Sequence, residues 1–357
     1  MTLWRSSPAE LFSSSHAMGP PIHWIDRVCA VASSRRRIFV EGFGEAAQIH
    51  PRMSDEWFAA PPQPIEITWA APPRVVGRLA VRDGTFRSPV VDLPGVARVA
   101  HVRELLPRDA RPAAEQPMYV VFGATGEAGF AARTLLLRPV VESTGIGALL
   151  LENPLYGLRR PPGQRGTVVR TVGEQMLMTI GMIDEGRALL AWLAARGHTQ
   201  LGTTGFSMGA TIAALVAARW PGPVAAAILG AGLSSVPVFV RGLLSRWVDF
   251  EQLGRGLGGA EEARQRLARY IEVIDLDRHP LPRCPAAAVI VGARHDGYVS
   301  ADEVQRLHEL WTGSEVRWLL TGHAGAVVRH AEALRRATVE AMERLGRALA
   351  GERPARR

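Results

Sequence analysis

From residue 117 onward, short apolar runs alternate with longer segments of helical spacing, and this alternation limits the fold more than any other feature of the sequence. Continuous apolar strands separated by helices are typical of a parallel sheet that is covered by helices on both faces. We therefore predict an α/β fold with a mostly parallel, twisted sheet. The predicted strands are residues 118–122, 146–151, 201–206, 224–229, 287–291 and 316–320, and the predicted helices begin near residue 130, cover 172–195, follow residue 207 as far as 219 and close the chain over 331–350.

The chain before residue 117 follows a different pattern. Residues 24–40 carry apolar side chains at helical spacing, which predicts a helix packed on the main domain, with a helix lying on a membrane surface as the alternative. Prolines interrupt residues 51–75, and short extended pieces fit at 65–69, 75–81 and 96–105. We expect these pieces to form an antiparallel start to the sheet.

Residues 233–283 interrupt the alternation, because they are helical, rich in Arg and poorly periodic. We interpret them as an insertion that covers the active edge of the sheet as a lid or cap. The predicted organisation is a loose tail over residues 1–23, a helix and antiparallel strands over 24–116, a first part of the core over 117–232, the lid over 233–283 and a second part of the core over 284–357.

Composition argues against several classes of protein. The net charge is +8, but every basic residue other than His is Arg, which is typical of a GC-rich, bacterial genome, and the charge is spread along the chain. We therefore expect no nucleic-acid partner, and keep peripheral membrane contact through an Arg-rich surface as an alternative.

Two cysteines, Cys29 and Cys284, do not suggest a disulfide framework. No apolar run reaches signal-peptide or membrane-spanning length, so the expected location is the cytoplasm.

The run Gly205-Phe206-Ser207-Met208-Gly209 matches the Gly-x-Ser-x-Gly turn that presents a nucleophilic serine. A predicted strand precedes it and a predicted helix follows it, which is the context that this turn requires. Small residues two positions before and after Ser207 let neighbouring backbone approach closely. The alternative is a serine that only caps the following helix.

A serine hydroxyl needs a base, and in this architecture the chain order is serine, acid, histidine. His323 lies in a Gly-flanked loop between the last strand and the last helix, and it is the predicted base. Asp296 follows the strand 287–291 and is the predicted acid that orients the base. The competing residues are the histidines His295, His308 and His330 and the acids Asp249 and Glu251.

The tetrahedral intermediate of such a reaction needs backbone donors. We predict the N–H groups of Met208 and of Thr125, in the Gly-rich turn 123–127, as this oxyanion hole. The turn lacks the spacing of a nucleotide-binding loop, and no cluster has credible metal-ligand spacing, so we expect no cofactor and no metal.

Loops at the carboxyl ends of parallel strands line the ligand crevice of α/β folds. We therefore predict substrate contacts from the turn after strand 118–122, from the Arg-rich loop 152–160 that follows strand 146–151, and from the apolar run 236–240 of the lid. The loop's Arg side chains are a candidate site for an anionic group, with a solvated loop as the alternative. The predicted substrate-binding residues are Gly126, Glu152, Asn153, Tyr156 and Phe239.

Several runs together resemble the alpha/beta-hydrolase domain-containing protein 18 family. They are residues 38–44, 84–89, 125–127, 150–157, 205–209 and 322–323, and the Glu-Asn-Pro-Leu-Tyr-Gly run over 152–157 is the most specific. The resemblance covers most of the chain from about residue 24. It implies an alpha/beta-hydrolase fold with Ser207 as nucleophile and His323 as base, and carboxylic-ester hydrolysis, with a lipid ester as substrate in some members.

Our leading hypothesis is a serine hydrolase that cleaves a small-molecule or lipid carboxylic ester through Ser207, His323 and Asp296 and an acyl-enzyme intermediate. The alternatives are an acyltransferase or peptidase that uses the same side chains, and an inactive member in which the fold serves as a binding module.

Overall fold

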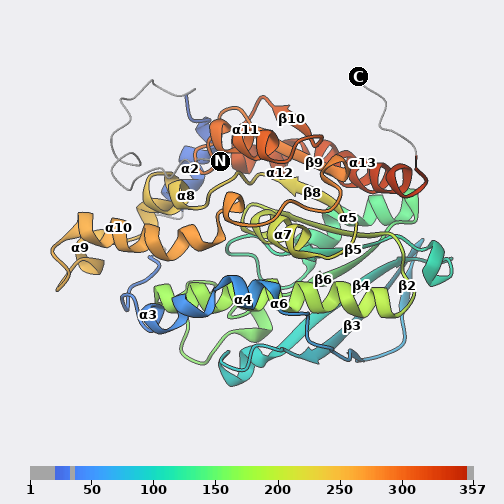
Figure 1. The fold of residues 1–357 in the computed structure, drawn as a ribbon, viewed down its shortest axis with the longest axis horizontal. Coiled ribbons are helices and arrows are strands. Elements are labelled where there is room, and N and C mark those ends of the chain that lie inside the picture. Colours follow the sequence, from blue (N-terminus) through green and yellow to red (C-terminus); the bar gives the residue numbers. More distant parts are fainter. Residues whose placement is uncertain (1–20, 33–36, 352–357) are drawn as a thin grey trace.

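A ten-stranded sheet runs through the computed structural model, which describes residues 21–32 and 37–351 (Figure 1). Its strand order is β1-β3-β4-β6-β5-β7-β8-β9-β10, with β2 paired to β3. Neighbouring strands are parallel from β6 to β10 and antiparallel from β1 to β6 on the other side. The strands are β1 Thr68–Trp69, β2 Arg74–Val76, β3 Leu79–Arg87, β4 Val99–Pro107, β5 Met118–Phe122, β6 Gly147–Leu151, β7 Leu201–Phe206, β8 Ala225–Leu229, β9 Ala288–Ala293 and β10 Glu315–Leu319. The predicted α/β fold with a mostly parallel sheet is confirmed.

Helices cover both faces of the sheet (Figure 1). Helices α6, α7 and α11 pack on one face, and α5 and α13 pack on the other. None of the helices in the described ranges is both long enough and apolar enough to cross a membrane. The helices are α2 Trp24–Ala32, α3 Ala46–Ile49, α4 Asp55–Ala59, α5 Ala131–Thr144, α6 Val172–Ala195, α7 Met208–Arg219, α8 Val236–Val240, α9 Phe250–Leu253, α10 Ala260–Ile271, α11 Ala301–Leu310, α12 His323–Arg329 and α13 Ala331–Leu349.

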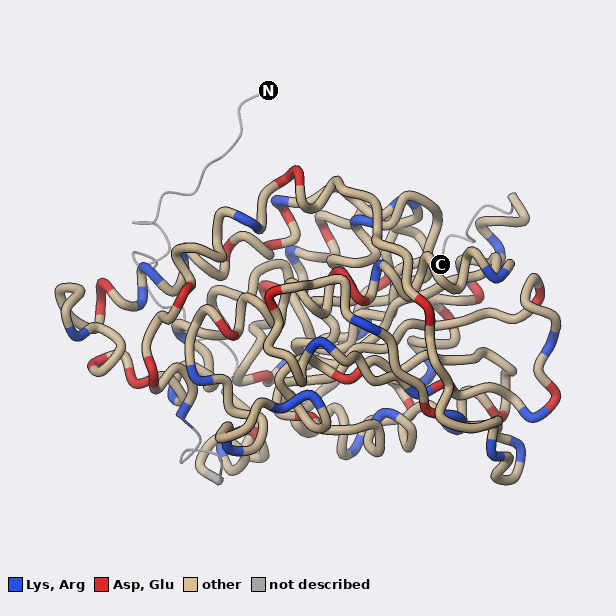
Figure 2. The backbone as a smooth tube through the Cα atoms, turned by 90° about the horizontal axis from the view of Figure 1, so that it is seen from below, with Lys and Arg blue, Asp and Glu red and all other residues tan. Residues whose placement is uncertain are grey.

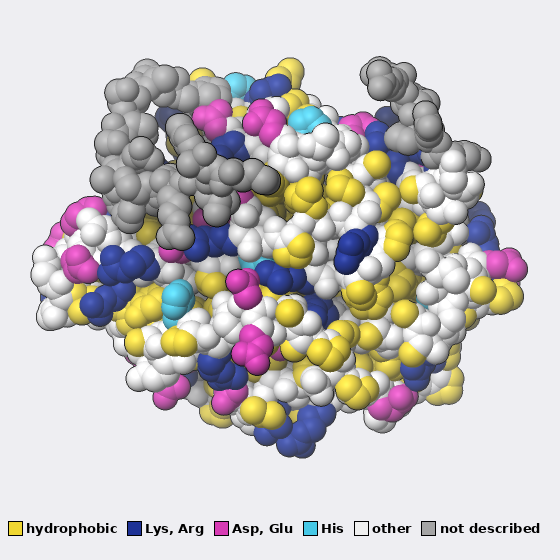
Figure 3. All heavy atoms as spheres, viewed as in Figure 1, with side chains coloured by type: hydrophobic (Ala, Val, Ile, Leu, Met, Phe, Trp, Pro, Cys, Tyr) yellow, Lys and Arg dark blue, Asp and Glu magenta, His cyan; other side chains and the backbone are white. Residues whose placement is uncertain are grey.

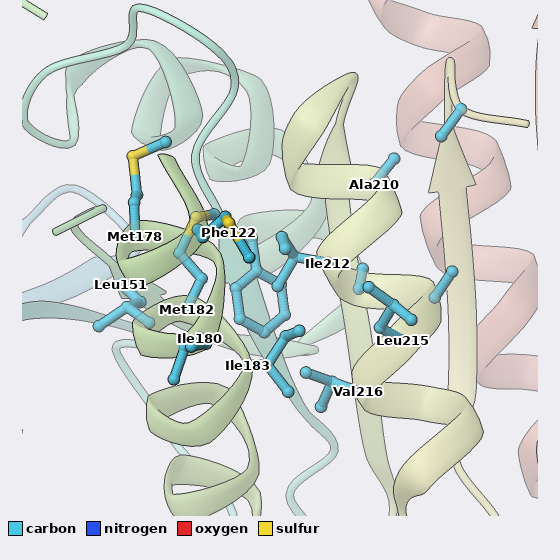
Figure 4. Close-up of a cluster of buried hydrophobic side chains, with 14 of the residues drawn as sticks. Phe122, Leu151, Met178, Ile180, Met182, Ile183, Ala210, Ile212, Leu215 and Val216 are labelled. Carbon is cyan, nitrogen blue, oxygen red and sulfur yellow. The ribbon is translucent and has the colours of Figure 1, made fainter. Parts of the chain in front are cut away.

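The apolar strands are buried because successive side chains point to opposite faces of the sheet and meet two different cores. In β5, Val120 and Phe122 join the core under α6 and α7, whereas Tyr119 and Val121 join the core under α5 and α13. Figure 4 shows Phe122 between α6 and α7. A Cβ atom at Gly186 of α6 would lie 2.5 Å from this ring, so a glycine there lets the helix approach the sheet.

The insertion between β8 and β9 contributes α8, α9 and α10, which lie together at one end of the molecule (Figure 1). Its beginning and its end meet, because the N–H of Leu276 donates a hydrogen bond to the carbonyl oxygen of Leu233 over 3.0 Å. Helix α8 leads into the short 3-10 helix Leu243–Trp247, and both border the cavity described below.

Three predictions for the N-terminal part need correction. The helix predicted over 24–40 is described as α2 over Trp24–Ala32, and residues 33–36 lie outside the described residues. Beyond them Ile38 is not helical, because it forms a parallel bridge with Val248 of the insertion. The extended piece predicted over 75–81 is a hairpin, since β2 and β3 are joined through Gly77, whose φ of 66° is open to glycine. The piece predicted from residue 96 begins as a 3-10 helix over Gly95–Arg98 before β4.

Charged side chains of both signs are distributed around the molecule. Figure 2 shows Arg interspersed with Asp and Glu along the described backbone, and on the face in Figure 3 basic side chains alternate with acidic and apolar ones. These views agree with the spread of Arg along the sequence.

Candidate active site

Ser207 stands between β7 and α7 in a backbone conformation that few residues other than glycine adopt. Its φ is 55° and its ψ is −122°. Its N–H donates to the carbonyl oxygen of Leu229 over 2.9 Å, which ties the turn to the neighbouring strand β8. Conformations of this kind cost about 1–3 kcal/mol and persist where the surrounding structure enforces them. The turn therefore fixes the position of the serine at the carboxyl end of the sheet.

The two glycines around Ser207 are needed for space. A Cβ atom at Gly205 would lie 2.5 Å from the backbone of Gly209, and a Cβ atom at Gly209 would lie 2.5 Å from the carbonyl oxygen of Phe122. Helix α7 therefore begins in direct contact with strand β5. Because helix N-termini carry unpaired N–H groups and a partial positive charge, anionic species are stabilised beside Ser207.

His323 and Asp296 form a hydrogen-bonded pair. The distance from His323 Nδ1 to Asp296 Oδ2 is 2.6 Å, and the two side chains are 10% and 2% exposed. His323 is the first residue of α12, and Asp296 lies on the loop after β9. Since Nδ1 faces the carboxylate, Nε2 is the ring nitrogen left for a reaction partner.

The second oxygen of Asp296 is also occupied. Oδ1 accepts hydrogen bonds from the N–H groups of Tyr298, at 2.7 Å, and Val299, at 2.8 Å. The rings of Phe206 and Tyr298 lie 4.7 Å and 5.2 Å from the His323 ring, measured between centroids. The carboxylate and the imidazole are thus both held in place, which favours one tautomer of the histidine.

The surroundings of His323 favour its protonated form. Burial works to lower the pKa of the imidazole, but the charge and hydrogen bond of Asp296 and the charge of Asp26 outweigh it, so the pKa is raised above 6.5. A base with a raised pKa holds a proton more readily once it has received one. The arrangement therefore stabilises an imidazolium between the two acids.

Ser207 and His323 border one cavity of about 260 Å³ at the carboxyl edge of the sheet. No hydrogen bond joins the two side chains in the described part of the chain; such bonds commonly tighten when a substrate binds.

Met208 and Thr125, the predicted oxyanion donors, border the same cavity. As the first residue of α7, Met208 has an N–H without an acceptor in its own helix. The other side chains of the lining are mainly apolar and include Ile212, Val238, Phe239, Leu244, Trp247, Ile274 and Val299.

Of the predicted substrate-binding residues, only Phe239 borders this cavity. Glu152 and Asn153 are 1% exposed and bind the backbone of nearby turns instead. Glu152 accepts hydrogen bonds from the N–H groups of Gly129 and Leu158, and Asn153 pairs with the N–H and the carbonyl oxygen of Gly123. The structure thus assigns these two side chains to holding the turn that carries Thr125.

Tyr156 and Gly126 also act behind the cavity wall. Tyr156 is 1% exposed, and its hydroxyl is hydrogen-bonded to the backbone of Gly126, while burial raises the pKa of the phenol to about 12. Gly126 has a φ of 80°, which a left-handed turn requires. Tyr156 therefore supports the turn 123–127 and does not face the main cavity.

The expectation of an anion site on the Arg-rich loop does not hold for Arg159. This side chain is fully buried and paired with Glu185 of α6, with Nη2 2.5 Å from Oε1. It also donates to the carbonyl oxygens of Ala97 and Glu152. All of its donors face protein groups, so Arg159 anchors the loop to α6 and to the 3-10 helix Gly95–Arg98.

Two of the alternative candidates for the acid and the base have other roles. Asp249 caps α9 by accepting a hydrogen bond from the N–H of Gln252, and the ring of His308 pairs with Ser314. Sequence reasoning missed Asp26, a fully buried acid of α2 that accepts hydrogen bonds from the backbone of Gly297 and of His323. An acid in the first turn of a helix has an ordinary explanation in the helix dipole, so no pattern singles it out.

Within residues 21–32 and 37–351, no group of three or more His, Cys, Asp or Glu is placed to hold a metal ion.

The mostly parallel sheet, the sharp turn at Ser207 and the pairing of Asp296, after β9, with His323, after β10, define an alpha/beta-hydrolase fold. The family model described as alpha/beta hydrolase domain containing 18 matches residues 38–260 and 256–344. The chain belongs to this family, as the resemblance predicted.

Solved structures share the fold at low sequence identity. An acetyl xylan esterase from Paenibacillus superposes with a TM-score of 0.51 at 14% identity, covering 85% of this chain and 98% of that one. Acetyl xylan esterase 1 from Thermoanaerobacterium gives 0.50 at 13% identity, covering 88% and 98%. An S-formylglutathione hydrolase from Agrobacterium tumefaciens gives 0.50 at 12% identity, covering 78% and 100%.

Proposed function

We propose that this protein is a serine hydrolase that cleaves carboxylic esters. The observation that carries the proposal is the pairing of His323 with Asp296 on the cavity that Ser207 also borders. A strained serine and a buried imidazole at one cavity, with a buried carboxylate bound to the far side of the imidazole, form the arrangement that acyl transfer requires. The family and the esterases of the same fold support the proposal.

In the proposed reaction, Ser207 Oγ attacks the carbonyl carbon of the ester and its proton moves to His323 Nε2. Asp296 holds the imidazolium through Nδ1–H, and the N–H groups of Met208 and Thr125 bind the oxyanion. The tetrahedral intermediate collapses, and the leaving alkoxide takes the proton from Nε2. Water then loses a proton to Nε2 and attacks the acyl carbonyl carbon. The second tetrahedral intermediate collapses to the free acid as its bond to Ser207 Oγ breaks, and Oγ takes the proton back from Nε2.

The cavity favours an uncharged acyl group. Among the residues that the structure describes, its lining carries no Arg, Asp or Glu, and its titratable side chains are His323 and Tyr298. Its volume of about 260 Å³ lies below the roughly 300–1,000 Å³ usual for small-molecule sites. We therefore propose a short or medium acyl chain, with the longer chains of lipid esters extending past α8.

Labelling with a fluorophosphonate probe tests the nucleophile. The wild-type protein is expected to become labelled and Ser207→Ala is not. Ser235→Ala is the matched control, because Ser235 is another hydroxyl on the same cavity and its substitution should leave the label in place. Equal labelling of wild type and Ser207→Ala would refute the assignment of Ser207 as nucleophile. Loss of the label in Ser235→Ala alone would identify Ser235 as the nucleophile instead.

Hydrolysis of p-nitrophenyl esters of increasing acyl length tests the substrate class. We expect turnover that peaks at short or medium chains and disappears in Ser207→Ala. Matched anilides and added acceptor alcohols distinguish a peptidase or an acyltransferase from an esterase. Labelling without turnover of any ester would contradict the ester assignment while leaving the nucleophile in place.

A further inference from the structure

Asp26 joins two loops that carry the proposed acid and base. It lies in the first turn of α2 and is 0% exposed. Oδ2 accepts hydrogen bonds from the N–H groups of Gly297, at 3.0 Å, and His323, at 2.8 Å, and Oδ1 accepts one from Ala324 at 2.9 Å. Gly297 follows the proposed acid Asp296 directly. The Asp26 carboxylate therefore binds the backbone of the residue after the acid and the backbone of the proposed base, His323.

These three backbone donors replace the water that a buried carboxylate loses. A charged group is costly to bury unless hydrogen bonds or an opposite charge compensate it. No cation pairs with Asp26 among the described residues, whereas hydrogen bonds from N–H groups to a carboxylate are strong. The compensation therefore comes from the backbone of the two loops, and the loops must keep their positions to provide it.

The base loop is shaped to admit this carboxylate. A Cβ atom at Gly322 would lie 2.6 Å from Asp26 Oδ2, so a glycine before His323 leaves room for the acid. Helix α2 packs against α12, which begins at His323. The Gly-His pair of the sequence is thus matched to an acid that lies 297 residues earlier.

We propose that Asp26 is a positioning residue for the base of the proposed serine hydrolase. It fixes the backbone of His323 relative to the loop of Asp296, and it adds a second negative charge beside the imidazolium that forms during the reaction. The proposal rests on the proposed function, because it concerns the base of that mechanism.

The titratable groups that face His323 come from two elements. Asp296 and Tyr298 approach from the loop after β9, Asp26 approaches from α2, and Cys29 of α2 lies near Tyr298. Burial lowers the pKa of His323, and the charges of Asp296 and Asp26 raise it. Loss of the Asp26 charge alone should therefore lower the pKa of the base, while loss of Asp296 would also remove its hydrogen bond.

The variant Asp26→Asn tests the proposal, because it keeps the shape of the side chain and one acceptor but removes the charge. We expect kcat for a p-nitrophenyl ester to fall about 100-fold, as for a misplaced catalytic group, with a smaller change in KM. The acid limb of kcat/KM against pH reports the pKa of the free base, and it should move to lower pH. A merely structural defect would lower the plateau without moving this limb.

Two controls separate the possible results. Arg27→Ala changes an exposed neighbour on α2 and should leave both the rate and the limb unchanged. Ser207→Ala reports on the proposed function: if it is labelled like wild type, the serine mechanism fails. If Ser207→Ala is unlabelled and Asp26→Asn has the wild-type kcat and pH profile, only the role of Asp26 fails.

Folding is measured alongside by circular dichroism. If Asp26→Asn does not fold, Asp26→Ser provides a smaller acceptor without the charge, and the same movement of the limb is expected. Failure of both variants to fold would assign Asp26 to the stability of the whole structure and would overturn the proposal.

Discussion

Asp275 Oδ1 accepts a hydrogen bond from the N–H of Ser235 over 3.2 Å, and so connects the end of the insertion to its beginning. Ser234 and Ser235 border the cavity, and the N–H of Ser234 donates to Glu303 of α11 over 2.8 Å. The base of the insertion is thus held by two acids from different parts of the chain.

Asp275 predicts a dependence of stability on pH. Burial, with Asp277 and Glu303 nearby, raises the pKa of Asp275 from 3.8 to about 8, although hydrogen bonds from Ser234 and Ser235 oppose the rise. The folded chain therefore keeps a proton that the unfolded chain loses above about pH 4, and the associated stability is fully present below pH 4 and is lost as the pH rises to about 8. Asp275→Asn should remove this loss.

Thermal unfolding at pH 5 and pH 8.5 provides the measurement. Because 1 kcal/mol corresponds to about 2–4 °C in a larger domain, the Asp275→Asn protein should gain several degrees over wild type between the two pH values. Asp109→Asn, in an exposed loop, is the control and should follow wild type. Parallel curves for Asp275→Asn and wild type would contradict the expectation.

Two glycines in helices should respond to alanine in opposite ways. Gly209→Ala places a Cβ atom 2.5 Å from the carbonyl oxygen of Phe122, so α7 would have to move away from β5. We expect a large drop in Tm and loss of fluorophosphonate labelling. Gly346→Ala in α13 meets nothing nearer than 3.6 Å and should stabilise the protein by about 0.5–1 kcal/mol. Equal Tm values for the two variants would show that the turn around Ser207 is not crowded.

The buried pair of Arg159 and Glu185 predicts a large effect on stability. Arg159→Met leaves the buried Glu185 without its cation, and removal of one partner of such a pair costs about 3–5 kcal/mol. The control is Arg138→Met, from the partly exposed pair of Arg138 with Glu142 on α5, where a change of less than about 0.5 kcal/mol is expected. Urea unfolding of both variants checks the difference, and similar midpoints would contradict it.

Phe239 of α8 predicts a change in specificity. Its ring borders the cavity and stacks near Phe39, with 6.2 Å between centroids. Phe239→Ala should enlarge the cavity and move the preferred p-nitrophenyl ester to a longer acyl chain. Leu135→Ala, at a side chain 72% exposed on α5, should leave the preference as in wild type. An unchanged optimum in Phe239→Ala would place the acyl chain elsewhere.

The fold was predictable because its strands are buried on both faces. Runs such as 118–122 and 225–229 are apolar throughout, and this pattern does not depend on distant contacts. The hairpin around Gly77 could not be predicted from the sequence, because β2 is exposed along its length and has no buried apolar face to mark where the strand ends. Local pattern therefore predicted the covered part of the sheet and failed at its edge.

The pairing of two of the candidate residues was predictable from a rule of chain order. The order of serine, acid and histidine selected Asp296 and His323, which the structure brings to 2.6 Å. Glu152 and Asn153 were misjudged as ligand contacts, because polar residues at a strand end look the same whether they face a ligand or hold a turn. Asp26 was missed because its partners follow 271 and 297 residues later, beyond any local pattern.

The distance between Asp26 and its partners along the chain also orders events during synthesis. At about 5–20 residues per second, a ribosome adds the residues from Asp26 to His323 in roughly 15–60 s. Throughout that time α2 has left the synthesis site while the loops that its acid binds do not yet exist. Assembly around His323 is therefore among the last steps in the maturation of the nascent polypeptide, and a truncated translation product that stops before residue 323 carries Ser207 without the proposed base.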